Sequence, residues 1–501
     1  MSIKRNIVAN YAGQLYATLI GVLLVPLYVE TMGVEAYGLV GFFSMLQGWF
    51  MLLDMGLTPT IGRETARFNG GAIDALGLRR LLRAFEGIFV AVGAAGALAL
   101  IAAAGTIADH WLRVQQLDLA EVRRAIVLMA LIVALRWLCG LYRGVISGFE
   151  RIVWLSGFNI VIATLRFVLV IPFLIYVGAS PTYFFVYQFA VAFIEAAALI
   201  VKAYRLLPNA ALPGWIRWQW QPMKGVTRFA LSAAFTSVVW VLVTQTDKLV
   251  LSGLIPLTEY AYFTLAVLLA SGIALLSSPV TGAILPRLTK LNAQGNEAGL
   301  IRLYRDATQL VAVIAVPVVL VLAFFPEQVL TAWTGKMAVV KNAAPVLTLY
   351  AVGNGILAFA AFPYYLQVAR GNLTLHVIGN LLFVLLFVPL LLVAVNRFGM
   401  IGAGYAWIVA NLLPFVAWLP VVHRRHLKGL HADWLVKDIG AVVLLPTISA
   451  ALIFHYVQWP LARLWVMTIL LLVYAGLAVL AAASSSTVRN RLRARTSLAA
   501  A

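Results

Sequence analysis

Long runs of apolar residues constrain this chain's fold more than any other feature of its sequence. Apolar windows bounded by charged residues, Pro or Gly recur along all 501 residues. A helix that spans a membrane needs roughly 20 such residues, whereas barrel strands alternate polar and apolar positions. Only 11% of the residues are charged and 63% are hydrophobic, which excludes a soluble globular protein, a disordered chain and a coiled coil. The sequence therefore predicts an all-α polytopic membrane protein.

We predict about fourteen transmembrane helices from these windows. Their residue ranges are 7–30, 36–60, 84–108, 124–148, 153–177, 182–204, 228–253, 258–284, 309–332, 343–368, 373–395, 402–422, 438–457 and 464–483. An even number of spans places both termini on the same side of the membrane. The remaining residues form short loops, with no room for a sizeable soluble domain.

The distribution of basic residues predicts the orientation. If the N-terminus is cytoplasmic, 26 of the 37 Lys and Arg residues fall in cytoplasmic segments, 7 in the opposite loops and 4 inside spans. Cytoplasmic loops of membrane proteins carry the excess of Lys and Arg. We therefore expect both termini in the cytoplasm. The formal charge of +19 then reflects topology and binding to the lipid bilayer surface, not to nucleic acid.

An internal repeat relates two halves of the chain. A shift of 224 residues aligns Glu35 with Glu259, and a shift of 221 aligns Asn159 with Asn380. The repeat covers six helices, an even number, so the halves run in the same direction and are related by a pseudo-two-fold axis along the membrane normal. Two further helices follow the repeat at its C-terminal end.

This repeat predicts the domain organisation. The predicted parts are an N-terminal six-helix lobe (1–208), a C-terminal six-helix lobe (209–425), two additional transmembrane helices (426–484) and a basic cytoplasmic tail (485–501). Such an arrangement places a substrate site between two lobes at the middle of the membrane.

Charged residues inside the spans are the sharpest functional signal. The basic candidates are Arg136, Arg143, Arg166 and Lys248, and the acidic candidates are Asp54, Glu195 and Asp247. A central Arg or Lys costs roughly 2.5–3.5 kcal/mol to insert, so each needs compensation. Two interpretations stay open. The basic residues line a cationic, water-filled cavity that receives an anion, or they pair with the acidic residues or extend to the membrane interface.

Polar uncharged residues add a second signal. Asn10 and Gln14 are four residues apart, so they form a polar stripe on the first helix that points away from lipid. Gln47 and Gln245 extend this polar set in other helices. The stripe either lines the cavity or forms hydrogen bonds between helices. Asp247 either forms a structural ion pair or couples transport to a proton or sodium gradient, and we expect the same two alternatives for Asp54 and Glu195.

Several motifs are absent from the sequence. No G-x-x-x-x-G-K-[ST] motif occurs, so this chain does not hydrolyse ATP. No metal-ligand spacing of His with carboxylates recurs, and the single cysteine, Cys139, excludes an internal disulfide. We therefore expect no metal, no cofactor beyond a coupling ion and no catalytic residues.

Four segments resemble the polysaccharide-biosynthesis flippases of the O-antigen (Wzx/RfbX) type. They read RNIVANYAGQLYATLIGVLLVPLYVETMGVEAYGLVGFF, LLDMGLTPTIGRETAR, TQTDKLVLSGLIPLTEYAYF and LPRLTKL, and the resemblance spans about residues 5–425. It implies the multidrug/oligosaccharidyl-lipid/polysaccharide exporter superfamily, with a MATE-like fold of two six-helix bundles around a V-shaped cavity. It also implies that Arg136, Arg143, Arg166 and Lys248 form the cationic cavity of the family.

The resemblance further implies a function in the bacterial inner membrane. Members move a polyprenyl-diphosphate-linked oligosaccharide from the cytoplasmic to the periplasmic leaflet by alternating access, for surface polysaccharide synthesis. Their partners include the lipid-linked glycan and polysaccharide polymerase machinery. A diphosphate headgroup is anionic and suits Arg, which agrees with the excess of basic residues inside the spans.

Three alternatives are weighed against this function. An ion-coupled drug/cation antiporter shares the fold but requires an acidic cavity, whereas the four basic candidates outnumber the three acidic candidates, Asp54, Glu195 and Asp247. A membrane enzyme such as a polysaccharide polymerase or ligase requires a large outer loop with catalytic residues, and the sequence predicts none. A flippase for the peptidoglycan lipid precursor carries the same kind of headgroup, and the sequence leaves this alternative open.

Overall fold

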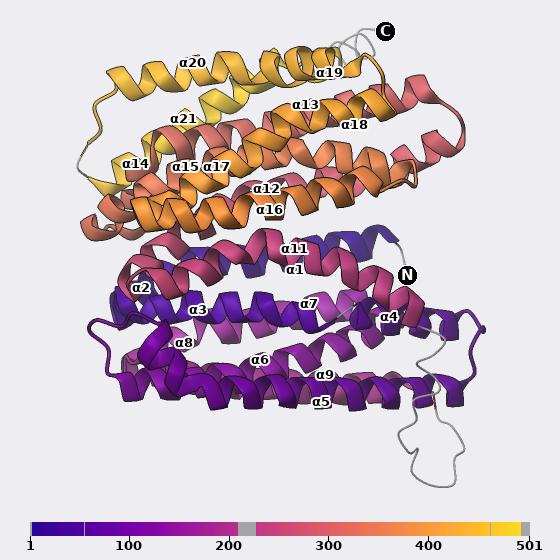
Figure 1. The fold of residues 1–501 in the computed structure, drawn as a ribbon, viewed down its shortest axis with the longest axis vertical. Helices are drawn as coiled ribbons and strands as arrows, with labels where there is room; N and C mark the ends of the chain where they lie inside the picture. The colour runs from indigo at the N-terminus through magenta and orange to yellow at the C-terminus, as the bar shows by residue number, and fades with distance from the viewer. Residues whose placement is uncertain (1–2, 55, 209–226, 461, 492–501) are drawn as a thin grey trace. The chain divides into compact units, whose positions relative to one another are not determined.

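The computed structural model describes residues 3–54, 56–208, 227–460 and 462–491, and nearly all of them are helical (Figure 1). These ranges contain no β-strand, only an isolated bridge between Arg113 and Pro256. Within them, 13 helical spans are long and apolar enough to cross a membrane. Helix α11 (Thr227–Leu254) additionally covers the predicted seventh span. The prediction of an all-α polytopic membrane protein with about fourteen spans is therefore confirmed.

The chain divides into two compact units, Met1–Ala261 and Tyr262–Ala501. Helices of the first unit are α1 (Ile3–Leu23), α2 (Val25–Met32), α3 (Val34–Phe50), η1 (Met51–Asp54), α4 (Leu57–Asn69), α5 (Ala75–Thr106), η2 (Ile107–Trp111), α6 (Leu119–Gly148), α7 (Ile152–Ala163), η3 (Thr164–Val168), α8 (Val170–Val177), α9 (Pro181–Leu206) and α11. Helix α12 (Leu257–Ala293) begins in this unit and continues into the second.

The second unit holds the remaining helices. They are α13 (Glu297–Phe324), α14 (Pro326–Thr334), α15 (Met337–Ala369), α16 (Thr374–Phe398), α17 (Met400–Ala417), α18 (Leu419–His426), α19 (Leu430–Asp433), η4 (Trp434–Gly440), α20 (Ala441–Tyr456) and α21 (Arg463–Ser484).

Local capping signals explain where several helices begin. Asp74, Asp118, Ser180 and Asn296 occupy the N-cap positions of α5, α6, α9 and α13, and each side chain accepts a backbone N–H from the first turn. These bonds satisfy donors that a helix start leaves unpaired. The predicted second span, 36–60, ends earlier than expected at Asp54, because Gly56 has a φ of 70° and a new helix, α4, follows it.

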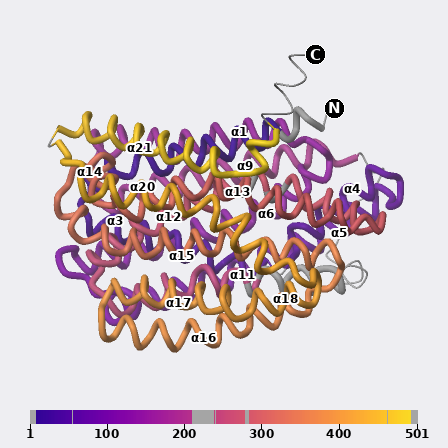
Figure 2. The backbone as a smooth tube through the Cα atoms, turned by 90° about the horizontal axis from the view of Figure 1, so that it is seen from above, coloured from indigo at the N-terminus to yellow at the C-terminus, as the bar shows by residue number. Residues whose placement is uncertain are grey.

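Helix α6 is the centre of the first unit. It packs against α3, α4, α5 and α9, and Figure 2 shows α6 between α5 and α9. Its contact with α4 depends on the absence of side chains, because a Cβ on Gly148 would lie 2.5 Å from the carbonyl oxygen of Gly62. Small residues allow this close approach of two helix backbones within a membrane.

In the second unit, α13 packs against α15, α20 and α21, and α17 packs against α15 and α16. Figure 2 shows α16 and α17 lying alongside each other. The stacked rings of Tyr350 and Trp407, with centroids 5.6 Å apart, fill the contact between α15 and α17. The two helices predicted beyond the repeat, 438–457 and 464–483, correspond to α20 and α21.

Residues that the sequence repeat aligns lie on matching elements. Glu35 and Glu259 both fall in the first turn of their helices, α3 and α12. Asn159 lies in α7 and Asn380 in α16. The predicted boundary after residue 208 borders residues 209–226, which lie outside the described residues. The compact units divide the chain later than this boundary, so the lobes 1–208 and 209–425 stay a prediction based on the repeat.

Candidate functional site

The first unit contains a cavity of about 340 Å³ beside α1, α6, α7 and the π-helical turn η3. Polar side chains that line it come from Asn10, Gln14, Thr18, Arg143, Ser156, Asn159 and Arg166. The structure thus brings two residues of the predicted polar stripe, Asn10 and Gln14, together with two of the predicted arginines. Hydroxyl, amide and guanidinium groups dominate its polar surface.

Helices α6 and α9 carry matching polar pairs behind this cavity. Arg136 and Arg143 are seven residues apart on α6, and Gln188 and Glu195 are seven apart on α9. Nη2 of Arg136 donates to Oε1 of Gln188 at 2.9 Å, and Nη2 of Arg143 donates to Oε1 of Glu195 at 2.6 Å. Seven residues are about two helical turns. The two helices therefore run in the same direction, and their two polar contacts lie about two helical turns apart.

The buried carboxylate of Glu195 bridges two arginines. Its second oxygen, Oε2, accepts a bond from Nη2 of Arg166 at 2.6 Å. Arg143 also donates through Nη1 to the side-chain oxygen of Asn159. The Glu195 side chain is 3% exposed, compared with 29% for Arg143 and 22% for Arg166. The carboxylate therefore lies at the back of the site, and the two arginines present their charge to the cavity.

Arg166 lies on an irregular part of its helix. It belongs to η3, where the backbone N–H of Leu169 donates to the carbonyl of Thr164 at 3.1 Å, five residues back. The carbonyl of Arg166 accepts a bond from Nε2 of Gln188 at 2.8 Å. π-turns of this kind occur frequently at functional sites. The Nε of Arg166 is buried and has no acceptor among the described residues.

Arg136 lies outside the cavity lining and has no carboxylate partner among the described contacts. Its Nη1 donates to Oε1 of Gln47 at 2.6 Å, and its guanidinium carbon lies 5.0 Å from the centre of the Phe43 ring. Two neutral amides and an aromatic face therefore compensate this cation. Arg136, Arg143 and Arg166 together have one carboxylate, so this region is strongly cationic.

Lys248 is held on its own helix, α11. Its Nζ lies 3.4 Å from Oδ1 of Asp247 and donates to the carbonyl of Thr244 at 2.5 Å. The neighbouring Gln245 packs against α3, where a Cβ on Gly48 would lie 2.7 Å from Cδ of Gln245. Neither Lys248 nor Gln245 lines the cavity, and Gln47 does not line it either. The predicted cationic set is thus divided between the arginines and the Asp247–Lys248 pair.

Asp54 has a local structural partner. It ends η1, and its Oδ1 accepts bonds from the backbone N–H of Thr58 at 3.1 Å and from the Thr58 hydroxyl at 2.5 Å. These bonds support the first turn of α4. The three acidic residues considered for ion coupling therefore occupy different settings: a helix start, an arginine bridge and a Lys–Asp pair. Their coupling roles stay predictions.

Several residues of the site were missing from the sequence prediction, among them Gln188 and Asn159. Gln188 accepts a hydrogen bond from Arg136, and Asn159 accepts one from Arg143, but neither residue was assigned to the site. A signal for Gln188 is present in the sequence, because its spacing of seven from Glu195 repeats the spacing of Arg136 and Arg143. A Gln and a Glu at that spacing on a second helix offer one acceptor to each of two intramembrane arginines at the same spacing.

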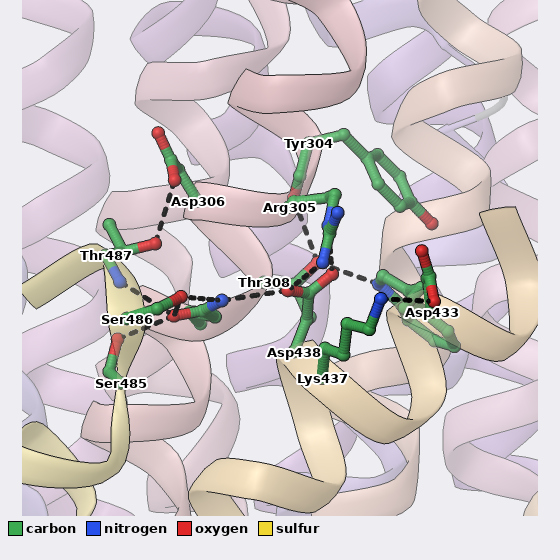
Figure 3. Close-up of polar contacts among 12 residues, drawn as sticks. Tyr304, Arg305, Asp306, Thr308, Asp433, Lys437, Asp438, Ser485, Ser486 and Thr487 are labelled. Atoms are coloured by element: carbon green, nitrogen blue, oxygen red, sulfur yellow. Dashed lines mark hydrogen bonds and ion pairs between the residues drawn. The ribbon is translucent and has the colours of Figure 1, made fainter.

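The second unit contains a different polar cluster, at the contact of α13 with η4 and with the residues after α21 (Figure 3). Asp438 is fully buried and accepts from Nε and Nη2 of Arg305 at 2.7 and 3.1 Å. It also accepts from Nε2 of Gln309 at 2.8 Å. Oε1 of Gln309 in turn accepts from the Ser485 hydroxyl at 2.8 Å and the Thr487 N–H at 3.0 Å.

This cluster is structural in character. Its bonds fasten the two C-terminal helices to α13, and they bury the first residues of the predicted tail, 485–501. The last ten residues of that tail, 492–501, lie outside the described residues. Among the described residues, no group of three His, Cys, Asp or Glu side chains could hold a metal ion.

The fold defines a polytopic membrane protein, and comparisons with known proteins show which solved structures share it. The chain has the fold of the structure named "Lipid II flippase MurJ, inward closed conformation", with a TM-score of 0.71 and 14% identity over 96% of this chain and 98% of that one. It is also similar to the "Inward-facing conformation of a multidrug resistance MATE family transporter of the MOP superfamily" (TM-score 0.68, 15% identity, 82% and 94% coverage).

Sequence comparison gives the family. The model of the family described as "Polysaccharide biosynthesis protein" matches residues 3–292, which is more than half of the chain. The chain is also 20% identical to the "Putative O-antigen transporter" of Shigella flexneri over 420 residues, covering 82% of this chain and 96% of that protein. The protein therefore belongs to the polysaccharide biosynthesis protein family, and it shares its fold with solved flippase and multidrug-transporter structures.

Proposed function

We propose that this protein moves a polyprenyl-diphosphate-linked oligosaccharide from the cytoplasmic to the periplasmic leaflet of a bacterial inner membrane, by alternating access. The observation that supports this most is the cavity lined by Arg143 and Arg166, with Asn10, Gln14 and Asn159 beside them. Guanidinium groups bind phosphate oxygens with matched geometry. Amide and hydroxyl groups suit the sugars.

The charge balance of the cavity favours this proposal over a drug/cation antiporter. Two arginines of the cavity, Arg143 and Arg166, share the single carboxylate of Glu195, and Arg136 nearby has only amide hydrogen-bond partners among the described residues. A cationic drug would be repelled by such a site, whereas a diphosphate would be attracted. The family match and the O-antigen relative support the same substrate class.

A transport assay tests the proposal. The purified protein is reconstituted in liposomes with a fluorescent polyprenyl-diphosphate sugar, and headgroup exposure to an impermeant quencher is followed with and without an imposed proton or sodium gradient. We expect protein-dependent exposure. Parallel vesicles with the peptidoglycan lipid precursor test that alternative, because preference for the precursor would reassign the substrate.

Substitutions connect transport to the cavity. Arg143→Gln and Arg166→Gln each remove a charged donor, and a lost charge-assisted hydrogen bond costs about 1.5–3 kcal/mol. We expect transport at low substrate concentration to fall about 10–100-fold, the equivalent of that free energy. The matched control is Arg123→Gln, because Arg123 pairs with the partly exposed Asp109 and does not line the cavity. Equal losses in all three variants would contradict the assignment of the site.

The proposal also includes cytoplasmic termini and contact with polysaccharide polymerase machinery. Fusion of alkaline phosphatase or a fluorescent protein to the C-terminus tests the orientation. We expect fluorescence and no phosphatase activity, because alkaline phosphatase matures only outside the cytoplasm.

A further inference from the structure

We propose that Glu195 is an internal anion that occupies the diphosphate-binding arginines of the unloaded cavity and yields Arg166 to the substrate. This inference rests on the proposed function and extends it, because it identifies the residue that sets substrate affinity. The bound group is a diphosphate attached to a lipid, and the sugar plays no part in the exchange.

The geometry of the bridge carries the inference. Each oxygen of one carboxylate receives one guanidinium nitrogen, from Arg143 and Arg166, at 2.6 Å in both cases. A phosphate group also presents neighbouring anionic oxygens, so the two guanidinium groups are already directed at the arrangement that a phosphate offers. Glu195 is 3% exposed and both arginines line the cavity. A substrate therefore reaches the arginines from the side opposite the carboxylate.

The guanidinium N–H donors of these arginines are not all hydrogen-bonded to the bridging carboxylate. Arg166 gives one nitrogen, Nη2, to Glu195, and its Nε is buried without an acceptor among the described residues. Arg143 gives its second nitrogen, Nη1, to the neutral oxygen of Asn159. A buried donor without an acceptor costs about 1–3 kcal/mol. If Arg166 turned toward a phosphate in the cavity, its guanidinium group would gain acceptors for donors that the bridge leaves unused.

The cluster in the second unit also pairs an arginine with a buried carboxylate, but there both oxygens bind a single arginine. Asp438 takes two nitrogens from one Arg305 and a third bond from Gln309, and it is fully buried (Figure 3). Its bidentate pair resembles the arrangement that arginine adopts in permanent ion pairs. Glu195 instead divides its oxygens between two arginines that border a cavity, which leaves each of them able to exchange its partner.

The exchange explains how the site can both bind and release an anion. Without substrate, Glu195 compensates the cations, which would be costly to leave unpaired in the membrane. When a diphosphate enters, Arg166 turns to it while Glu195 keeps Arg143. When the diphosphate leaves, Glu195 recovers Arg166, so the carboxylate competes against the substrate and lowers its affinity.

Binding of inorganic pyrophosphate to purified full-length protein tests this competition by titration calorimetry. Glu195→Gln keeps one acceptor oxygen and removes the charge, which releases one arginine. Asn159→Asp keeps the acceptor oxygen for Arg143 and adds a charge. A neighbouring charge changes such an equilibrium by about tenfold. We expect pyrophosphate to bind about tenfold more tightly to Glu195→Gln and about tenfold more weakly to Asn159→Asp, relative to the unmodified protein.

Farnesyl diphosphate is the second probe, because it distinguishes a lipid-linked diphosphate from a free one. The same gain with both probes supports the inference, and a gain with pyrophosphate alone overturns the link to a lipid substrate. Unchanged or weaker binding to Glu195→Gln overturns the competition, while normal liposome transport by the unmodified protein would leave the proposed function standing. If Glu195→Gln unfolds more easily, pyrophosphate must raise its melting temperature more than that of the unmodified protein. A smaller rise refutes the inference.

Discussion

The buried carboxylate of Asp438 gives the sharpest stability prediction. Asp438→Ala removes the acceptor of three hydrogen bonds, from Nε and Nη2 of Arg305 and from Nε2 of Gln309. Removing one partner of a buried ion pair costs about 3–5 kcal/mol. Arg305 is 30% exposed, so water can solvate part of its charge. We therefore expect a loss of about 2–4 kcal/mol in the free energy of unfolding.

A matched control lies on the same stretch of chain. Asp433 forms an ion pair with Lys437, with 2.8 Å between Oδ1 and Nζ, and their side chains are 49% and 62% exposed, respectively. Asp433→Ala removes the same chemical group one turn away, but water replaces the lost partner. We expect no measurable change in stability from this substitution.

The assay is reversible unfolding of the purified protein in mixed detergent micelles as the fraction of denaturing detergent rises, followed by circular dichroism. Hydrogen exchange adds a local readout, because loss of Asp438 should increase exchange in α20 and α21 before it affects the first unit. Equal effects of Asp438→Ala and Asp433→Ala would refute the reasoning, since burial would then make no difference.

Three further predictions concern the first unit. Glu35→Ala leaves three successive backbone N–H groups of the 112–118 loop without their carboxylate acceptor, and we expect hydrogen exchange there to rise about tenfold or more. Gly148→Leu places a side chain against the Gly62 carbonyl, so the yield of monodisperse protein should fall, whereas Gly157→Leu, with nothing within 4 Å, should fold normally. Lys248→Met should leave pyrophosphate binding within about twofold, because Lys248 does not line the cavity; a tenfold loss would return it to the site.

The sequence alone determined the class of fold and most of the span positions. Apolar windows of membrane length can form only helices, because lipid offers no hydrogen-bond partners to an open backbone. The sequence also marked Arg136, Arg143 and Arg166, since a charge inside a span always requires a partner. It could not predict the break at Gly56, because the sequence does not show whether a glycine in a span adopts a positive φ or continues the helix.

Only the tertiary structure decided which of these residues meet. Arg143 and Arg166 converge on Glu195, while Lys248 pairs with the residue beside it, although all four cations are candidates for one cavity from the sequence alone. The reason is physical. A span fixes how deep a residue lies in the membrane, but its partner depends on the rotation of each helix about its axis. That rotation follows from side-chain packing between helices, as in the parallel contact of α6 with α9.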